Sequence, residues 1–175
     1  MKKSVLAGII VLALILSLPA GLNAQELEDF DVEDLVAVAG FTYNTFVDTP
    51  AGPGIYLGAG MKATPEILVA GQYERFFTED LALNGIAGTF AYDFSPLLAL
   101  DQDLPELFVL GGLGYYFGEL ENESLSGMGI KAGAGAAQEV ANNIDIRGSL
   151  AYRLLDAGEV SLSGFEVSAG ISYDF

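Results

Sequence analysis

The feature that most narrows the fold of this chain is an alternation of residue character with a period of two. It is clearest in the last eleven residues, from Phe165 to Phe175. One parity there is apolar: Phe165, Val167, Ala169, Ile171, Tyr173 and Phe175. The other parity is small or polar: Glu166, Ser168, Gly170, Ser172 and Asp174. Successive side chains of a β-strand point to opposite faces, so this segment predicts a strand with two different faces.

The same alternation recurs in seven earlier segments. With the last one they span residues 35–44, 55–62, 67–74, 85–94, 107–117, 127–139, 144–154 and 165–175. Segments rich in Gly, Pro, Asn, Asp or Ser separate them, as turns require. We expect eight antiparallel strands of about ten residues, which is enough to cross a bilayer when tilted. The predicted fold is an all-β, eight-stranded up-and-down transmembrane β-barrel.

The contents of the two faces predict which one points outward. The polar parity carries many glycines and few of the Lys and Glu residues typical of a solvated surface, which suits the crowded interior of a small barrel. The apolar parity carries aromatic residues near the strand ends, which suits the two membrane interfaces. The alternative is a soluble, lipocalin-like lipid carrier with its apolar face inside. The absence of Trp, and hence of a Gly-x-Trp motif, argues against it.

The first 34 residues have a different character from the rest. Residues 1–24 combine a basic start, an apolar run and a small-residue end, which predicts a signal peptide cleaved after Ala24. A retained membrane anchor is the alternative, although the run is short for a span of about 20 residues. Residues 25–34 are acidic and are interpreted as a solvated periplasmic tail, with a lumen-inserted or partner-binding segment as the alternative. The barrel is expected over residues 35–175.

Charged residues on the polar parity predict a network inside the barrel. An unpaired charge in a narrow interior is costly, so these side chains are expected to pair. With the C-terminus on the periplasmic side, the outer half holds two cations and two anions, as a plugged interior requires. The predicted lumen network comprises Lys62, Glu74, Lys131, Asp145, Arg147, Arg153 and Glu166. Arg153 and Glu166 are candidates to face each other across the last hairpin.

Composition excludes several functions. The chain has no Cys and no His, so it lacks thiolate metal sites, the common zinc sites and every His-based catalytic arrangement. Its net charge of -17 argues against nucleic-acid binding. A Ser–Lys pair, such as Ser149 with Lys131, is formally possible but is the weaker interpretation. We therefore expect no catalytic residues, no metal and no cofactor.

The final segment resembles the C-terminal strand of bacterial outer-membrane β-barrel proteins. The matching positions are Val167, Ala169, Ile171, Tyr173 and Phe175. With the strand count, this is similar to the small eight-stranded OmpA/OmpX-type class. The resemblance implies an outer-membrane location, contact with outer-membrane lipids, and recognition by the barrel-assembly machinery and periplasmic chaperones during biogenesis.

Two membrane functions follow as hypotheses. The first is a non-enzymatic integral membrane protein with a plugged, salt-bridged interior that contributes to envelope structure. The second is a narrow or gated porin-like channel for small solutes or apolar molecules.

Overall fold

The structure is a computed structural model that describes residues 35–47, 51–78, 81–98, 104–120, 123–157 and 160–175. The predicted signal peptide and the acidic segment 25–34 lie outside these described residues. Eight strands and one 3-10 helix follow one another along the chain. They are β1 (Leu35–Phe46), β2 (Gly52–Thr64), β3 (Ile67–Phe77), β4 (Leu81–Asp93), η3 (Ser95–Leu98), β5 (Glu106–Leu120), β6 (Glu123–Ala141), β7 (Ile144–Ala157) and β8 (Val160–Asp174).

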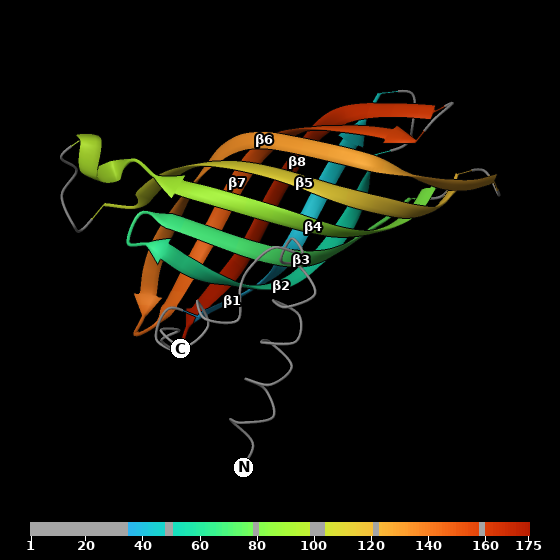
Figure 1. The fold of residues 1–175 in the computed structure, drawn as a ribbon. Coiled ribbons are helices and arrows are strands. Elements are labelled where there is room, and N and C mark those ends of the chain that lie inside the picture. The colour runs from blue at the N-terminus through green and yellow to red at the C-terminus, as the bar shows by residue number, and fades with distance from the viewer. Residues whose placement is uncertain (1–34, 48–50, 79–80, 99–103, 121–122, 158–159) are drawn as a thin grey trace, which may run out of the picture.

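The strands form one closed antiparallel barrel in sequence order (Figure 1). Each strand pairs with its neighbours in the chain, and β1 closes the sheet by pairing with β8 from Val36↔Asp174 to Phe46↔Gly164. Closure leaves no unpaired sheet edge, which a strand structure needs in lipid because no water is present to bond free backbone groups. The predicted eight-stranded up-and-down barrel is therefore confirmed.

The barrel has two distinct ends. At one end lie Leu35, Asp174 and η3, and we call it the terminal end (Figure 1). At the other lie the C-terminal residues of the odd-numbered strands, Phe46, Phe77, Leu120 and Ala157, and we call it the loop end. The β6–β7 turn at the terminal end places Asn143 in the left-handed region, at a φ of 66°, which Asn tolerates better than most residues. No helix within the described part of the chain is long and apolar enough to cross a membrane.

The expected strand length of about ten residues is wrong. The strands contain 11 to 19 residues, and β5 to β8 each contain 14 or more. Much of the extra length lies at the loop end, where Leu81, Leu155 and Leu162 point into the barrel and are buried. The strands continue past the length that a bilayer requires, and this extra length lets the three leucines pack in one buried apolar cluster.

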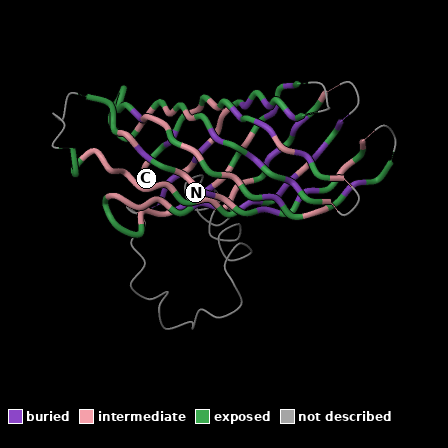
Figure 2. The backbone as a smooth tube through the Cα atoms, turned by 90° about the horizontal axis from the view of Figure 1, so that it is seen from above, coloured by how far each residue is buried: buried purple, intermediate pink, exposed green. Residues whose placement is uncertain are grey.

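The two faces of the wall point as predicted. Apolar side chains of one parity are exposed on the outside, including Phe41 at 72% and Leu57 at 64% relative exposure. The other parity is buried inside, and buried and exposed residues alternate along the strands (Figure 2). An apolar exterior on a closed antiparallel barrel is the surface that a lipid bilayer requires. A soluble carrier would need the reverse orientation, so the lipocalin-like alternative is wrong.

Because the apolar face of the wall points outward, a charged side chain introduced on that face is expected to destabilise the folded barrel. Leu113 of β5 lies near the middle of the exterior band and is 56% exposed. We expect Leu113→Arg to lower the free energy of unfolding by about 2–4 kcal/mol, because the guanidinium must enter hydrocarbon. Urea unfolding in phospholipid vesicles measures this. Ser161→Arg, at an exposed outward position near the loop end, is the control and is expected to be near neutral. Equal effects at the two positions would contradict the assigned membrane band.

Candidate functional site

Apolar side chains pack together inside the barrel at the loop end. They come from seven of the eight strands and form one buried cluster, which we call the apolar plug. Its members are Phe46, Phe76, Leu81, Leu83, Tyr116, Leu125, Leu155 and Leu162. Their side chains point inward, like those of the small and polar residues, and they lie near the loop end of their strands. The interior therefore changes from polar to apolar along its length.

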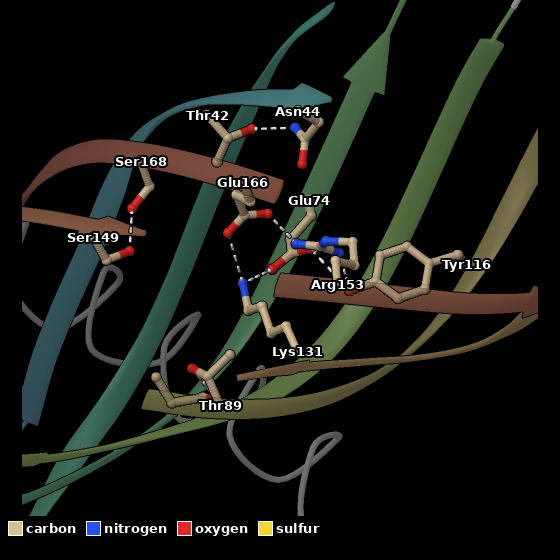
Figure 3. Close-up of polar contacts among 11 residues, drawn as sticks. Thr42, Asn44, Glu74, Thr89, Tyr116, Lys131, Ser149, Arg153, Glu166 and Ser168 are labelled. Carbon is tan, nitrogen blue, oxygen red and sulfur yellow. Dashed lines mark hydrogen bonds and ion pairs between the residues drawn. The ribbon is translucent and has the colours of Figure 1, made fainter. Parts of the chain in front are cut away.

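Four charged side chains meet directly beneath the apolar plug and form a closed ring across the lumen (Figure 3). Lys131 Nζ lies 2.7 Å from Glu74 Oε1 and 3.4 Å from Glu166 Oε1. Arg153 Nη1 lies 2.8 Å from Glu74 Oε2, and Arg153 Nη2 contacts Glu166 Oε2. We call these four residues the charge ring. Two cations and two carboxylates alternate around it, so its formal charge is zero.

The charge ring connects strands that are far apart in the barrel wall. Lys131 and Arg153 are directly opposite each other on β6 and β7, so two like charges occupy neighbouring positions. Such a pair is unfavourable alone. Glu74 reaches across from β3 and Glu166 from β8, and each carboxylate contacts both cations. The side chains of all four are at most 9% exposed, so the pairing occurs away from bulk water, where it is strongest.

Aromatic rings hold Arg153 in place. Its guanidinium carbon lies 4.6 Å from the centroid of Phe76 and 5.1 Å from that of Tyr116, both within cation–π range. The Tyr116 hydroxyl donates a hydrogen bond to Glu74 Oε2 at 2.9 Å and accepts one from Arg153 Nη1. Phe76 and Tyr116 also belong to the apolar plug. The plug and the ring are therefore one continuous packed unit.

Glycines in the wall make room for the Tyr116 ring. A Cβ on Gly129 would lie 2.6 Å from Tyr116 Cε2, and one on Gly85 would overlap the other edge of the same ring. Outward-facing Gly88, by contrast, would meet no atom within 4 Å. This confirms the interpretation that glycines on the polar parity serve a crowded interior.

A small cavity lies on the terminal side of the charge ring. Its volume is about 80 Å³, which is room for a few water molecules. Its polar lining includes Tyr56, Gln72, Ser149 and Ser168, and the two serine Oγ atoms are 2.6 Å apart. Ser149 and Lys131 both line this cavity, but Lys131 Nζ is held by two carboxylates. An ammonium so engaged is unsuited to act as the base of a Ser–Lys pair.

The terminal end opens into an acidic vestibule of about 350 Å³. Arg147 stands between this vestibule and the cavity, with its guanidinium 4.7 Å from the centroid of Phe108. Lys62 forms an ion pair with Asp174 at the rim. Asp145 accepts a hydrogen bond of 3.1 Å from Ser172. The acidic side chains that line the vestibule are Glu66, Asp93, Glu106, Glu139, Asp145 and Asp174.

The structure thus divides the seven residues proposed from the sequence. Glu74, Lys131, Arg153 and Glu166 come together in the charge ring. Lys62, Asp145 and Arg147 lie apart from it, in the vestibule. Arg153 and Glu166 make contact, but diagonally: the residue directly opposite Glu166 is Ala151.

Sequence reasoning missed the contacts of Phe76 and Tyr116 with Arg153, and it missed the apolar plug. Phe76, Leu81 and Leu83 continue the inward parity past the predicted strand ends. Extending each alternating segment as far as the next turn signal would have included these three residues in the predicted strands.

The proposed assembly residues occupy the outer face of β8. Val167, Ile171 and Tyr173 are exposed at 55%, 53% and 42%. Phe175 packs edge-to-face on Tyr173, with centroids 5.0 Å apart, and its backbone N–H donates to the Leu35 carbonyl at 3.1 Å. This row is apolar, continuous and directed away from the barrel. Within the described residues, no group of three or more acidic side chains is arranged to hold a metal ion.

These features define a closed eight-stranded transmembrane β-barrel. Solved structures of the same fold are the Neisserial surface protein A, with 17% identity and a TM-score of 0.66, and the N-terminal β-barrel domain of Pseudomonas aeruginosa OprF, with 14% identity and a TM-score of 0.56. Each aligns with 81% of this chain, which covers 97% and 98% of them, respectively. No family model and no curated protein matches the sequence. The likeness confirms the predicted fold, that of small bacterial outer-membrane barrels.

The charge ring predicts a large effect for the loss of one member. We expect Arg153→Met to lower the free energy of unfolding by about 3–5 kcal/mol, because two buried carboxylates are left with one cation. Equilibrium unfolding in detergent micelles measures this. Lys62→Met, which breaks the half-exposed pair with Asp174, is the control and is expected to cost about 1 kcal/mol or less.

A second substitution separates charge from packing. Adding Glu166→Gln to Arg153→Met restores a neutral ring and should recover part of the loss. If Arg153→Met is as mild as Lys62→Met, the ring is not a buried charge network.

Proposed function

We propose that this chain is a non-enzymatic integral protein of the bacterial outer membrane whose occluded barrel contributes to envelope structure. The observation that carries the proposal is the combination of an apolar exterior with a lumen filled by the charge ring and the apolar plug. The terminal end faces the periplasm and the loop end faces the cell exterior. In this orientation the plug lies on the outer side and the acidic vestibule opens toward the periplasm.

Two barriers in series support an occluded barrel. A solute entering from the vestibule meets first Arg147 on Phe108, then the small cavity, then the charge ring and finally the plug. The ring has no net charge, and each of its carboxylates contacts both cations, so it carries no excess charge to bind a passing ion. The plug beyond it excludes water and therefore excludes hydrated ions.

A gated channel is the second candidate, and one observation favours it. The cavity and the vestibule already leave space on the terminal side, so the charge ring and plug are the only full closure along the described lumen. A rearrangement of Arg153 and its aromatic neighbours would connect the two ends. Such a channel would require an alternative partner for each ring carboxylate.

Conductance in a planar bilayer distinguishes the two candidates. We expect the wild-type chain, Arg153→Ala and Phe76→Ala each to show no steady conductance, because the wild-type chain keeps both barriers and each single variant keeps one. The double variant Arg153→Ala, Phe76→Ala is expected to conduct. Gel mobility before and after boiling verifies that each variant is folded. Steady wild-type conductance would support the channel instead, and a folded but silent double variant would contradict closure by these two layers.

We further propose that the outer face of β8 is the signal for barrel assembly in cells. Its apolar row presents alternate side chains from Val167 to Phe175 on a strand that pairs with β1 only when the barrel closes. Before closure β8 has a free edge, which an assembly machine can pair with. Periplasmic chaperones are the expected carriers of the unfolded chain, and outer-membrane lipids contact the finished exterior.

The assembly proposal predicts a difference between folding in cells and in detergent. Phe175→Lys is expected to reduce the amount of assembled barrel in cells several-fold while refolding in micelles changes little, since Phe175 lies just past the end of β8 and outside the buried cluster of the barrel. Phe165→Lys, at the other end of the same face, is the control. Equal losses in cells and in micelles would mean that Phe175 acts through barrel stability alone.

A further inference from the structure

One cation of the lumen takes no part in the charge ring. Lys131 and Arg153 each contact two carboxylates, and Lys62 pairs with Asp174 at the rim. The guanidinium of Arg147, by contrast, forms no ion pair and no hydrogen bond with any residue that the structure describes. It borders both the acidic vestibule and the small cavity. A guanidinium carries five N–H donors, and those of Arg147 are available to a ligand.

Aromatic packing holds the Arg147 side chain in a defined position. Its guanidinium carbon lies 4.7 Å from the centroid of the Phe108 ring, within cation–π range. Phe108 is buried, and its ring lies against the wall at Gly135, where an added Cβ would come within 2.5 Å of Phe108 Cζ. The ring supplies no oxygen to accept a hydrogen bond from the guanidinium. A cation held in this way loses little freedom when it binds an anion, which favours affinity.

A hydroxyl group lies beside Arg147 and has no hydrogen-bond partner among the described residues. Gly170 of β8 is directly opposite Arg147 in the wall. A Cβ on Gly170 would overlap the Tyr56 hydroxyl oxygen, so this oxygen lies over the residue that pairs with Arg147. Two kinds of donor therefore meet where the cavity joins the vestibule. A carboxylate suits both, because each of its oxygens accepts more than one hydrogen bond.

The rest of the vestibule is unsuited to a ligand that is only an anion. Its lining contains six carboxylates and two cations, so its formal charge is -4. Asp174 is the only one of the six in contact with a cation of the described residues. Glu106 lies in the same row of the wall as Arg147, with Ala137 between them. A ligand whose anionic group reaches Arg147 must therefore present positive charge to the surrounding carboxylates.

We propose that the acidic vestibule binds a free basic amino acid. Its α-carboxylate contacts Arg147 and Tyr56, and its two cationic groups lie among the carboxylates of the wall. The volume of about 350 Å³ is in the range of small-molecule sites. Because the charge ring and the apolar plug lie beyond the cavity, the ligand enters and leaves through the vestibule. This binding activity goes beyond the proposed envelope role, and only its access from the periplasm rests on the proposed orientation.

Isothermal titration calorimetry of the folded full chain in non-ionic micelles tests the site. The probes are L-arginine, L-glutamate and agmatine, which has the guanidinium and amino groups of arginine but no carboxylate. We expect the wild-type chain to bind L-arginine at least tenfold more tightly than either other probe. If the acidic wall acted alone, agmatine would bind more tightly than L-arginine, because it lacks the negative group.

Four variants separate the contacts. Arg147→Met is expected to remove the preference for L-arginine over agmatine. Tyr56→Phe, which removes a single hydroxyl, is expected to weaken L-arginine binding several-fold and serves as the test if Arg147→Met folds poorly. Glu106→Gln is expected to weaken L-arginine and agmatine together. Arg75→Met is the matched control, because it removes an exposed cation of β3 that lies outside the vestibule, and is expected to leave all affinities unchanged.

Each contrary outcome identifies what is wrong. A wild-type chain that is folded, as gel mobility before boiling verifies, but binds no L-arginine overturns the site. Agmatine binding as tight as that of L-arginine overturns the carboxylate contact, and so does an undiminished preference in Arg147→Met. Equal binding of L-glutamate overturns the role of the acidic wall. An equal loss in Arg75→Met would mean that net charge, not the vestibule, governs binding. The conductance measurement tests the proposed occlusion separately, since ligand binding and closure of the lumen can fail independently.

Discussion

The interior of this barrel is governed by the need to neutralise charges that the wall directs inward. Once the apolar parity faces lipid, every residue of the other parity points into a narrow lumen. Two of these residues, Lys131 and Arg153, are neighbouring cations on paired strands. They are compatible with burial because Glu74 and Glu166 contact both of them from distant strands. The charge ring thus ties β3, β6, β7 and β8 together across the lumen, in addition to the hydrogen bonds of the wall.

The two ends of the lumen differ because different side chains follow the ring on each side. Toward the loop end, Phe76 and Tyr116 cover Arg153 and lead into a cluster of leucines. Toward the terminal end, small and hydroxyl side chains leave a cavity and then an acidic vestibule. A polar group is costly to bury unless it is paired, so the apolar plug can only begin where the ring has satisfied its own charges. The order of the layers follows from this requirement.

The alternation alone was enough to predict the strand number, the barrel and the orientation of its wall. It also placed the four ring residues on one parity in the same half of the barrel. It was not enough to predict which charges touch, because contacts across a lumen depend on the shear of the whole sheet. Arg153 meets Glu166 diagonally, and Glu74 comes from the far side of the barrel. The plug was missed because Leu81, Leu83 and Leu162 extend the strands past the length that the bilayer alone requires.

The most direct test of this account measures which face of β8 touches lipid. The chain has no Cys, so single-cysteine variants at Val167, Ser168 and Ala169 each carry one nitroxide label in phospholipid vesicles. Oxygen concentrates in hydrocarbon, so its collision rate with the label reports exposure to lipid. The account predicts high rates at Val167 and Ala169 and a low rate at Ser168, which lines the interior cavity. A high rate at Ser168 with low rates at its two neighbours would contradict the assigned wall and the buried charge ring with it.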